Sequence, residues 1–184
     1  LSWGRPLKSI LCLFDTSIVP FHFYHLQSTN KIFLGGPYDE KSVVVKNATH
    51  YFTLLKDKKI ILDHEERKKI ILNNLKTIFA KSKCENNPDP SLVEEVTNLV
   101  EYPTALKGKF SEDFLALPEE LLNLTMKQHQ RYFPMRSIDE GKIINQFITI
   151  SNNKDEKKLI IEGNERVLQA RLADAKFFWD KNKK

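Results

Sequence analysis

The sequence contains little cysteine and no long apolar run, and both scarcities exclude classes of protein. Its 184 residues include two cysteines, Cys12 and Cys84, which stand far apart and form no Cys-x-x-Cys pair. We therefore expect neither a disulfide framework nor a cysteine-based zinc site. The same scarcity predicts a reducing, cytoplasmic setting. The longest apolar run is the five residues from Ile10 to Phe14, whereas a membrane helix needs about 20. We expect a soluble protein without a membrane partner.

Glycine is also scarce, and its placement excludes a nucleotide-binding loop. The six glycines are scattered, and neither the pair before Pro37 nor Gly108 has the neighbours of a phosphate-binding motif. The five histidines predict no metal site either. His22 and His25 would point to opposite faces of a strand, and Asp63 is explained as a helix cap. We therefore expect no cofactor, no metal and no catalytic residue in this chain.

The charge balance slightly favours anionic partners. Twenty-nine lysines and arginines against 24 aspartates and glutamates give a net charge of +5. Such a balance suits RNA, but it favours ordinary solvation of a lysine-rich surface as the explanation. Hydrophobic residues make up 41% of the chain, so a real core is expected. Because Leu1 is not an initiator methionine, we predict one domain over residues 1–184 cut from a longer chain, with its one candidate subdivision near 84–90.

Strand and helix patterns alternate unevenly along the chain, which predicts a mixed α+β fold. The expected strands are two runs within 7–23 around a tight turn at Asp15, followed by 32–34, 43–45, 59–62, 105–110, 132–136 and 143–150. The remainder of 24–42 is predicted to be irregular. The expected helices start at Asn47, Asp63, Ser91, Pro118 and after Gly163-Asn164. In the first of them, Tyr51, Phe52 and Leu55 are expected to face inward.

One short segment combines cations, an amide and aromatic rings at the end of a predicted helix. It runs from Lys127 through His129, Gln130 and Arg131 to Pro134. Proteins use this mixture to contact phosphates and to stack on RNA bases. The same cations also suit a helix C-terminus, and the aromatic residues beside them would then belong to the core. The four polar residues are therefore candidates for RNA contact or for helix capping.

A second segment, residues 163–179, predicts a helix with apolar residues almost all around it. Leu168, Leu172 and Trp179 form one stripe, and valine, alanine and phenylalanine residues extend the apolar surface to other sides. The helix is therefore expected to be mostly buried, with Phe177 packed in the core. Charged residues on a buried helix need partners.

The polar residues of this segment support two interpretations. Asn164, Glu165, Arg171 and Asp174 are expected to form an internal polar network, in which Arg171 and Asp174 meet at i, i+3 spacing. Arg166 is the candidate for RNA contact in the same stretch. The sequence favours neither interpretation over the other.

Several stretches, in order, resemble the beta subunit of bacterial heterotetrameric glycyl-tRNA synthetase. The last two of them are long and specific to that family. The resemblance covers essentially the whole chain. The matching stretches are Arg5-Pro6-Leu7, Val19-Pro20-Phe21, residues 61–67, residues 91–118, residues 126–134 and residues 163–178.

The resemblance implies a place for this chain in a larger enzyme. In that family the adenylation site, with its ATP and glycine contacts, lies on the alpha subunit, and the beta subunit is needed for tRNA binding and charging. The chain would belong to the N-terminal half of the beta subunit, with the alpha subunit, in an α2β2 assembly, and tRNA(Gly) as partners. The fold implied is a mixed sheet or partly closed barrel with packed helices, resembling the B3/4 editing-type domain of phenylalanyl-tRNA synthetase.

Two alternatives and three departures accompany the resemblance. A subunit-interaction module would show a large exposed apolar patch, and a vestigial editing module would show a polar pocket.

Where the family has a Gly-His-Arg-Phe stretch, this chain has residues 30–33, Asn-Lys-Ile-Phe, so no role passes to that His or Arg. Arg131 replaces the usual lysine and keeps its positive charge, and Tyr102 stands where tryptophan is expected.

Overall fold

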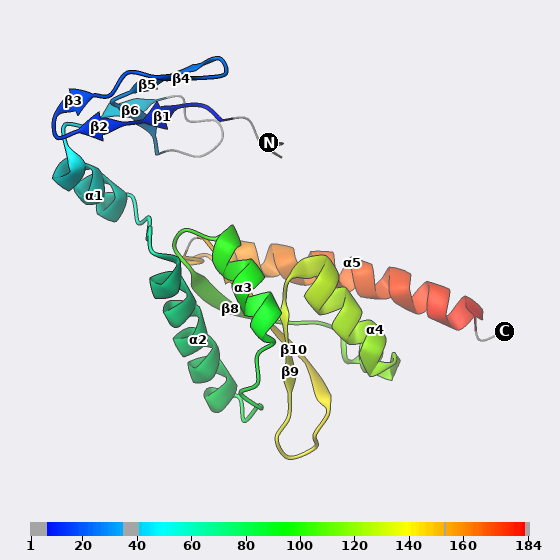
Figure 1. Ribbon diagram of the computed structural model, residues 1–184. Helices are drawn as coiled ribbons and strands as arrows, with labels where there is room; N and C mark the ends of the chain where they lie inside the picture. Colours follow the sequence, from blue (N-terminus) through cyan, green and yellow to red (C-terminus); the bar gives the residue numbers. More distant parts are fainter. Residues whose placement is uncertain (1–6, 35–40, 153, 183–184) are drawn as a thin grey trace. The chain divides into compact units, whose positions relative to one another are not determined.

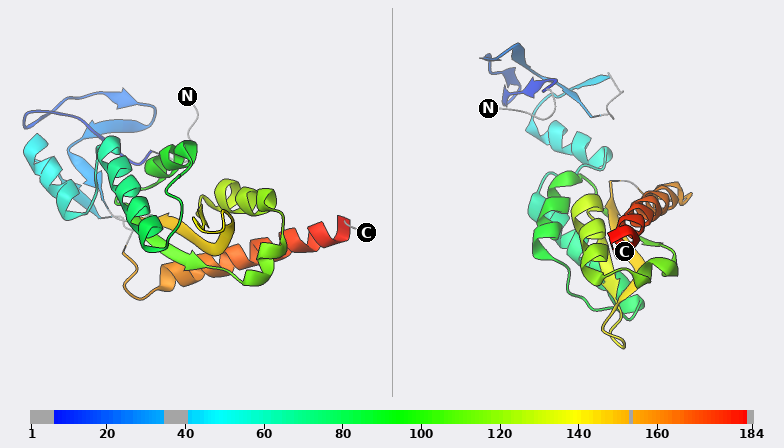
Figure 2. Two further views of the ribbon diagram at one scale, coloured as in Figure 1. Left: turned by 90° about the horizontal axis from the view of Figure 1, so that it is seen from below. Right: turned by 90° about the vertical axis from the view of Figure 1, so that its right-hand side faces the viewer.

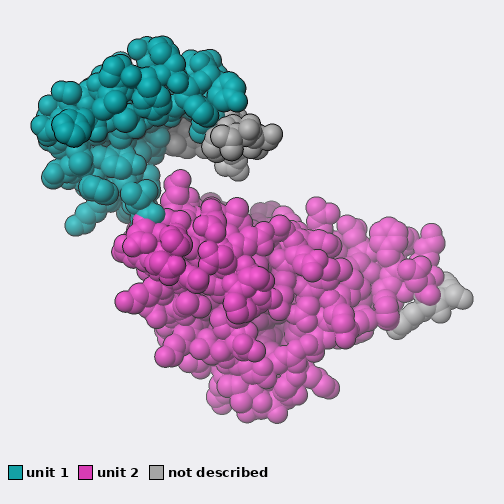
Figure 3. Space-filling model, in the orientation of Figure 1, with its two compact units in different colours: residues 1–62 teal, residues 63–184 magenta. Residues whose placement is uncertain are grey.

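The computed structural model describes residues 7–34, 41–152 and 154–182. The chain divides into two compact units, residues 1–62 and 63–184 (Figure 3). The division lies between residues 62 and 63, and the predicted boundary near 84–90 falls inside the second unit. The architecture is α+β, as predicted, with small open sheets in place of the partly closed barrel among the described residues. The likeness to a B3/4-type domain stays a prediction.

The first unit is built from short strands and one helix (Figure 1). Its predicted hairpin is confirmed, with Asp15 at φ 54° in the tight turn. A second hairpin turns at Tyr24, which adopts φ 53°, so its turn and second strand fall in the stretch predicted to be irregular. The turn lacks the glycine, asparagine or aspartate that usually signals one. The elements are β1 (Ile10–Leu11), β2 (Leu13–Phe14), β3 (Ser17–Ile18), β4 (His22–Phe23), β5 (Leu26–Thr29), β6 (Lys31–Phe33), β7 (Ser42–Val44) and α1 (Ala48–Asp57).

Helix α1 begins as predicted, but one of its side chains and the segment after it differ from the prediction. The Asn47 side chain accepts a hydrogen bond from the His50 N–H at 2.9 Å. Leu55 is buried, but Phe52, predicted to face inward, is 57% exposed. The predicted strand over 59–62 is wrong, because Lys59 takes φ 56° and the chain turns there at the end of the helix.

The second unit is a three-stranded antiparallel sheet between two helical layers. Its strands are β8 (Thr104–Lys109), β9 (Phe133–Arg136) and β10 (Ile143–Ser151), in the order β8-β10-β9. One face packs on α2 (His64–Lys81) and α3 (Pro90–Leu99). The other packs on the 3-10 helix η1 (Glu112–Ala116), on α4 (Glu119–Asn123), on the π-helix η2 (Leu124–His129) and on α5 (Leu159–Asn182) (Figures 1 and 2).

Each face of the sheet has its own apolar core. Ile71, Leu75 and Phe133 are buried in the core under α2 and α3. Phe147 lies in the other core, fully buried, and its ring stacks on Tyr132 with the centroids 4.7 Å apart. Because apolar burial is the main stabilising term in folding, these two layers hold the unit together.

Two helix starts differ from the sequence prediction. Asp63 caps α2 as predicted, accepting from the Glu65 N–H at 2.9 Å. The cap of α3 is Asp89 rather than Ser91, and Pro90 occupies the first helical position, where its missing N–H costs nothing. Helix α5 begins before Gly163-Asn164, because the Asp155 carboxylate accepts from two N–H groups of its first turn.

Candidate nucleic-acid interface

The segment predicted to contact RNA follows a π-helical turn. Helix α4 widens into η2, and the turn closes with Arg131 at the left-handed φ of 57°. The Tyr132 N–H then donates to the Met126 carbonyl at 2.9 Å. This geometry turns Met126 and Tyr132 into the core, and burial raises the pKa of Tyr132 to about 12. The cations between them remain near the surface.

Carboxylates of α3 hold the two main cations of this segment. The Lys127 ammonium lies 3.3 Å from Asp89 Oδ2, and Arg131 Nε lies 2.7 Å from Glu95 Oε1. On the other side of α3, Lys68 pairs with Glu94 at 2.8 Å. The acidic side chains of α3 therefore bind cations from both neighbouring helices.

Two of these acids, Asp89 and Glu94, have lowered pKa values. The Ser91 hydroxyl lowers the pKa of Asp89 most, and the Leu92 N–H and the Lys127 ammonium lower it further. Lys68 lowers the pKa of Glu94, and Glu94 in turn raises the pKa of Lys68. The side chains remain 32–47% exposed, so solvent screens each pair and it adds little to stability. The pairs orient the cations more than they stabilise the fold.

His129 faces a different surface from Lys127 and Arg131. It lines a groove of about 490 Å³ between η2 and α5, which we call the η2–α5 groove. Arg171, Asp174 and Phe178 line the same groove from α5. Gln130 is half-buried and ends the π-helix. The structure thus brings His129 together with residues far along the chain.

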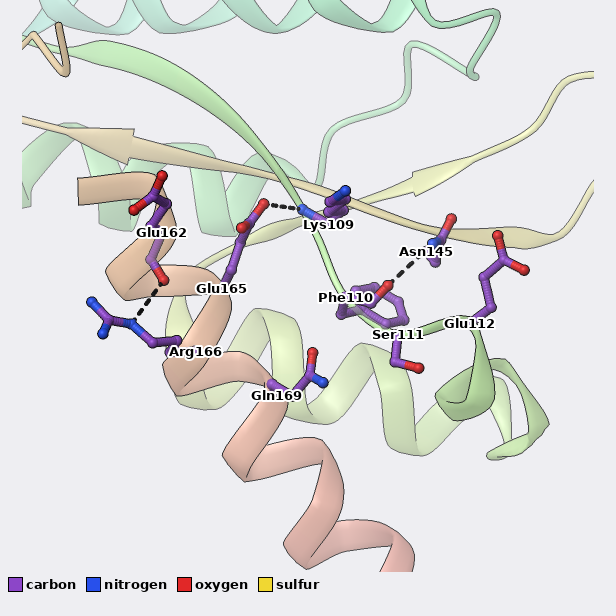
Figure 4. A pocket seen from close by; sticks show the side chains of 9 residues that line it. All are labelled: Lys109, Phe110, Ser111, Glu112, Asn145, Glu162, Glu165, Arg166 and Gln169. Atoms are coloured by element: carbon purple, nitrogen blue, oxygen red, sulfur yellow. Dashed lines mark hydrogen bonds between the residues drawn. The ribbon is translucent and has the colours of Figure 1, made fainter. Parts of the chain in front are cut away.

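Arg166 lies at a separate hollow of about 770 Å³ between α5 and the end of β8 (Figure 4). Its Nε atom donates to the Glu162 carbonyl within the helix at 3.4 Å. The neighbouring Glu165 accepts from the Lys109 backbone N–H at 2.8 Å, which ties α5 to β8. Arg166 and His129 therefore do not share a pocket.

Of the four residues predicted to form an internal polar network, Glu165 makes a hydrogen bond to another element, β8. Asn164 is half-buried beside Glu165. Arg171 and Asp174 both line the η2–α5 groove, but no salt bridge joins them in the part of the chain that the structure describes.

The prediction that α5 is mostly buried is wrong. Its buried residues are Ile161, Leu168 and Leu172, whereas Phe177 and Phe178 are each 62% exposed. The sheet lies along one side of the helix only, and the second half of α5 continues past the sheet beside α4 and η2 (Figures 1 and 2). Apolar residues of α5 that face neither the sheet nor these helices, such as Phe177, therefore meet solvent.

Sequence reasoning missed the acidic partners and the groove. Asp89 and Glu95 lie 38 and 36 positions from the cations they bind, so no local spacing relates them. The groove depends on how α5 packs beside η2. Within residues 7–34, 41–152 and 154–182, no group of three or more His, Cys, Asp or Glu is placed to hold a metal ion. No described helix has the length and apolar content to cross a membrane.

Comparison with known proteins finds relatives of the whole chain. The family model described as glycyl-tRNA synthetase beta subunit matches residues 1–184. The glycine–tRNA ligase beta subunit of Listeria monocytogenes is 39% identical over 185 residues, which cover 100% of this chain and 27% of the relative. Those of Lactobacillus delbrueckii and Dictyoglomus turgidum are each 40% identical over 181 residues, which cover 98% of this chain and 26% of the relative. The chain spans about a quarter of the length of these relatives.

Proposed function

The chain belongs to the glycyl-tRNA synthetase beta subunit family, and from this membership we propose that it works as a tRNA-supporting part of a glycine–tRNA ligase. In this proposal glycine is activated with ATP on an alpha subunit, within an α2β2 assembly in the cytoplasm. The chain itself holds no cofactor and helps to bind tRNA(Gly) for charging. The observation that carries the proposal is the family match over residues 1–184.

Pyrophosphate exchange tests the division of labour. We expect the purified 184-residue chain to show no glycine-dependent exchange between pyrophosphate and ATP, because activation takes place on the alpha subunit. The control is the complete alpha and beta assembly of a relative, assayed alongside. Glycine-dependent exchange by the chain alone would contradict the proposal.

The residues proposed to contact tRNA directly are Lys127, His129, Gln130, Arg131 and Arg166. The pairs of Lys127 and Arg131 with Asp89 and Glu95 support this proposal in one respect, since they hold both cations at the surface of one helix end. Phosphate contacts fix the position of a protein on a nucleic acid, and charge supplies much of the affinity.

The double variant Lys127→Ala/Arg131→Ala tests this contact. We expect the alpha and beta assembly to bind tRNA more weakly, and the slope of log affinity against log salt to fall by at most ~0.9 for each lost duplex phosphate contact. The melting midpoint should change little, because partly exposed ion pairs contribute about 0–1 kcal/mol.

Lys68→Ala is the matched control for this variant. Lys68 forms the same kind of pair with α3, through Glu94, but lies on α2, outside residues 127–134. We expect it to leave the salt slope unchanged. An unchanged slope in the double variant, together with a lower melting midpoint, would show instead that Lys127 and Arg131 serve only to hold η2 against α3.

A subunit-interaction module is the second candidate function. The exposed side chains of Phe177 and Phe178 favour it, as does the 46% exposure of Val167 on the same helix. A partner protein that covers this end of α5 would bury both phenylalanines. Protection of residues 167–178 from hydrogen exchange on addition of the alpha subunit alone, without tRNA, would support this second function.

A further inference from the structure

We propose that the η2–α5 groove binds one unpaired nucleotide of RNA, with its base stacked on Phe178 and its phosphate held by Arg171. This inference rests on the proposed function and deepens it, because it names a site and a part of the RNA. The groove, of about 490 Å³, falls within the roughly 300–1,000 Å³ typical of small-ligand sites.

The groove offers a base an aromatic surface. Phe178 is 62% exposed and lines the groove, with Ala175 and the half-buried Trp179 beside it. Proteins that bind single-stranded nucleic acids present exposed aromatic rings of this kind, because every base has a face that can stack on a ring. Phe177 carries an equally exposed ring but does not line the groove. The two rings contact each other edge to face, with their centroids 5.4 Å apart, and only the Phe178 ring lines the groove.

The polar groups around the ring suit a nucleotide better than an apolar side chain of a partner. Arg171 lines the groove from α5, is exposed, and makes no salt bridge in the described part of the chain. Its guanidinium is therefore available to a phosphate. Asp174 and His129 stand on the same groove, from α5 and η2 respectively. A carboxylate accepts from the amino group of a base, and an imidazole donates to or accepts from its edge.

The charges argue for an unpaired rather than a paired nucleotide. Arg171 and Asp174 are charged groups of opposite sign in the groove, and His129 adds a third titratable group. The groove itself is therefore close to neutral and attracts a duplex backbone weakly. Recognition here depends on the face and the edge of a base, which RNA exposes where its bases are unstacked.

Fluorescence anisotropy with two labelled probes tests the proposal. The probes are a tRNA(Gly) transcript and a ten-nucleotide single-stranded RNA, each titrated with the 184-residue chain. We expect Phe178→Ala to weaken binding of both by about 5- to 150-fold, the range that loss of one stacked base produces. Phe177→Ala, the matched control, should change either affinity by less than about twofold. Arg171→Gln should lower the salt slope for the single strand by about 0.7.

Three outcomes would contradict the proposal that the groove binds a nucleotide. Equal effects of Phe177→Ala and Phe178→Ala would show a general apolar surface. If the Phe178→Ala variant binds both probes as tightly as the wild type does, no base stacks on Phe178. The proposed function still holds in that case, provided that the wild-type chain binds tRNA in a salt-sensitive way. If Phe178→Ala abolishes binding of the alpha subunit and leaves the affinity for RNA unchanged, the groove belongs to a protein partner. If the wild-type chain and the complete assembly bind no tRNA, the proposed function fails as well.

Discussion

Replacing Phe147 with alanine is expected to lower the free energy of unfolding by about 3–5 kcal/mol, the usual cost of removing a fully buried ring. The same change at Phe177 is expected to cost less than about 1 kcal/mol. Phe147 has no exposed surface and stacks on Tyr132, whereas Phe177 is 62% exposed. Urea melts of both variants, compared with the wild type, measure the difference.

The ionisation of Tyr132 gives a second readout of the same substitution. Burial raises the pKa of this phenol to about 12 from its usual 10.0. If the Phe147→Ala cavity admits water, the pKa of Tyr132 should move back towards 10, which ultraviolet absorbance detects. A larger loss of stability at Phe177 than at Phe147 would mean that α5 packs on its outer side in solution.

The local elements were predictable where a short polar signal starts or ends them. Asn47 and Asp63 are predicted as helix caps, and each side chain accepts a hydrogen bond from a backbone N–H of the first helical turn. The strands predicted over 132–136 and 143–150 are confirmed as β9 and β10, and Gly141 in the turn between them has φ 62°. In each case the conformation depends on hydrogen bonds or backbone freedom within a few residues, which is information that the sequence carries locally.

The errors share a different physical cause. The hairpin at Tyr24 was missed because the surrounding strands impose a left-handed conformation on a residue that does not prefer it. The burial of α5 was overestimated because an apolar surface all round a helix does not reveal how many sides have a neighbour. Phe178 could be placed in a groove only after α5 was packed beside η2.

The candidate interface shows the same limit. The sequence identified Lys127 and Arg131 as cations at a helix end, and in the structure Lys127 lies in η2 whereas Arg131 lies just past its end at a left-handed φ. Their pairing with Asp89 and Glu95 depends on contacts across 38 and 36 positions of the chain. Whether a surface cation is already paired decides how much charge it offers to a phosphate, so this part of the site needed the fold.

Gly108 is expected to be among the residues of the second unit that tolerate substitution least, although no sequence motif surrounds it. Gly108 lies on β8 directly opposite Phe147 of β10. A Cβ atom on Gly108 would lie 2.6 Å from Phe147 Cζ and 2.8 Å from Ile161 Cδ1. Both neighbours belong to the core under α5, and Phe147 has no exposed surface, so the added methyl group would have to displace packed side chains. Gly108 therefore serves close packing between the sheet and α5.

We expect Gly108→Ala to lower the free energy of unfolding by about 1–3 kcal/mol through overpacking. Gly163→Ala is the matched control, because Gly163 lies within α5 and a Cβ there would meet nothing within 4 Å. That change should raise stability by about 0.5–1 kcal/mol, since alanine favours a helix over glycine. The two variants add the same methyl group and should move the urea midpoint in opposite directions. A stabilising Gly108→Ala would show that α5 sits farther from β8 in solution, and the bond from the Lys109 N–H to Glu165 would then be lost as well.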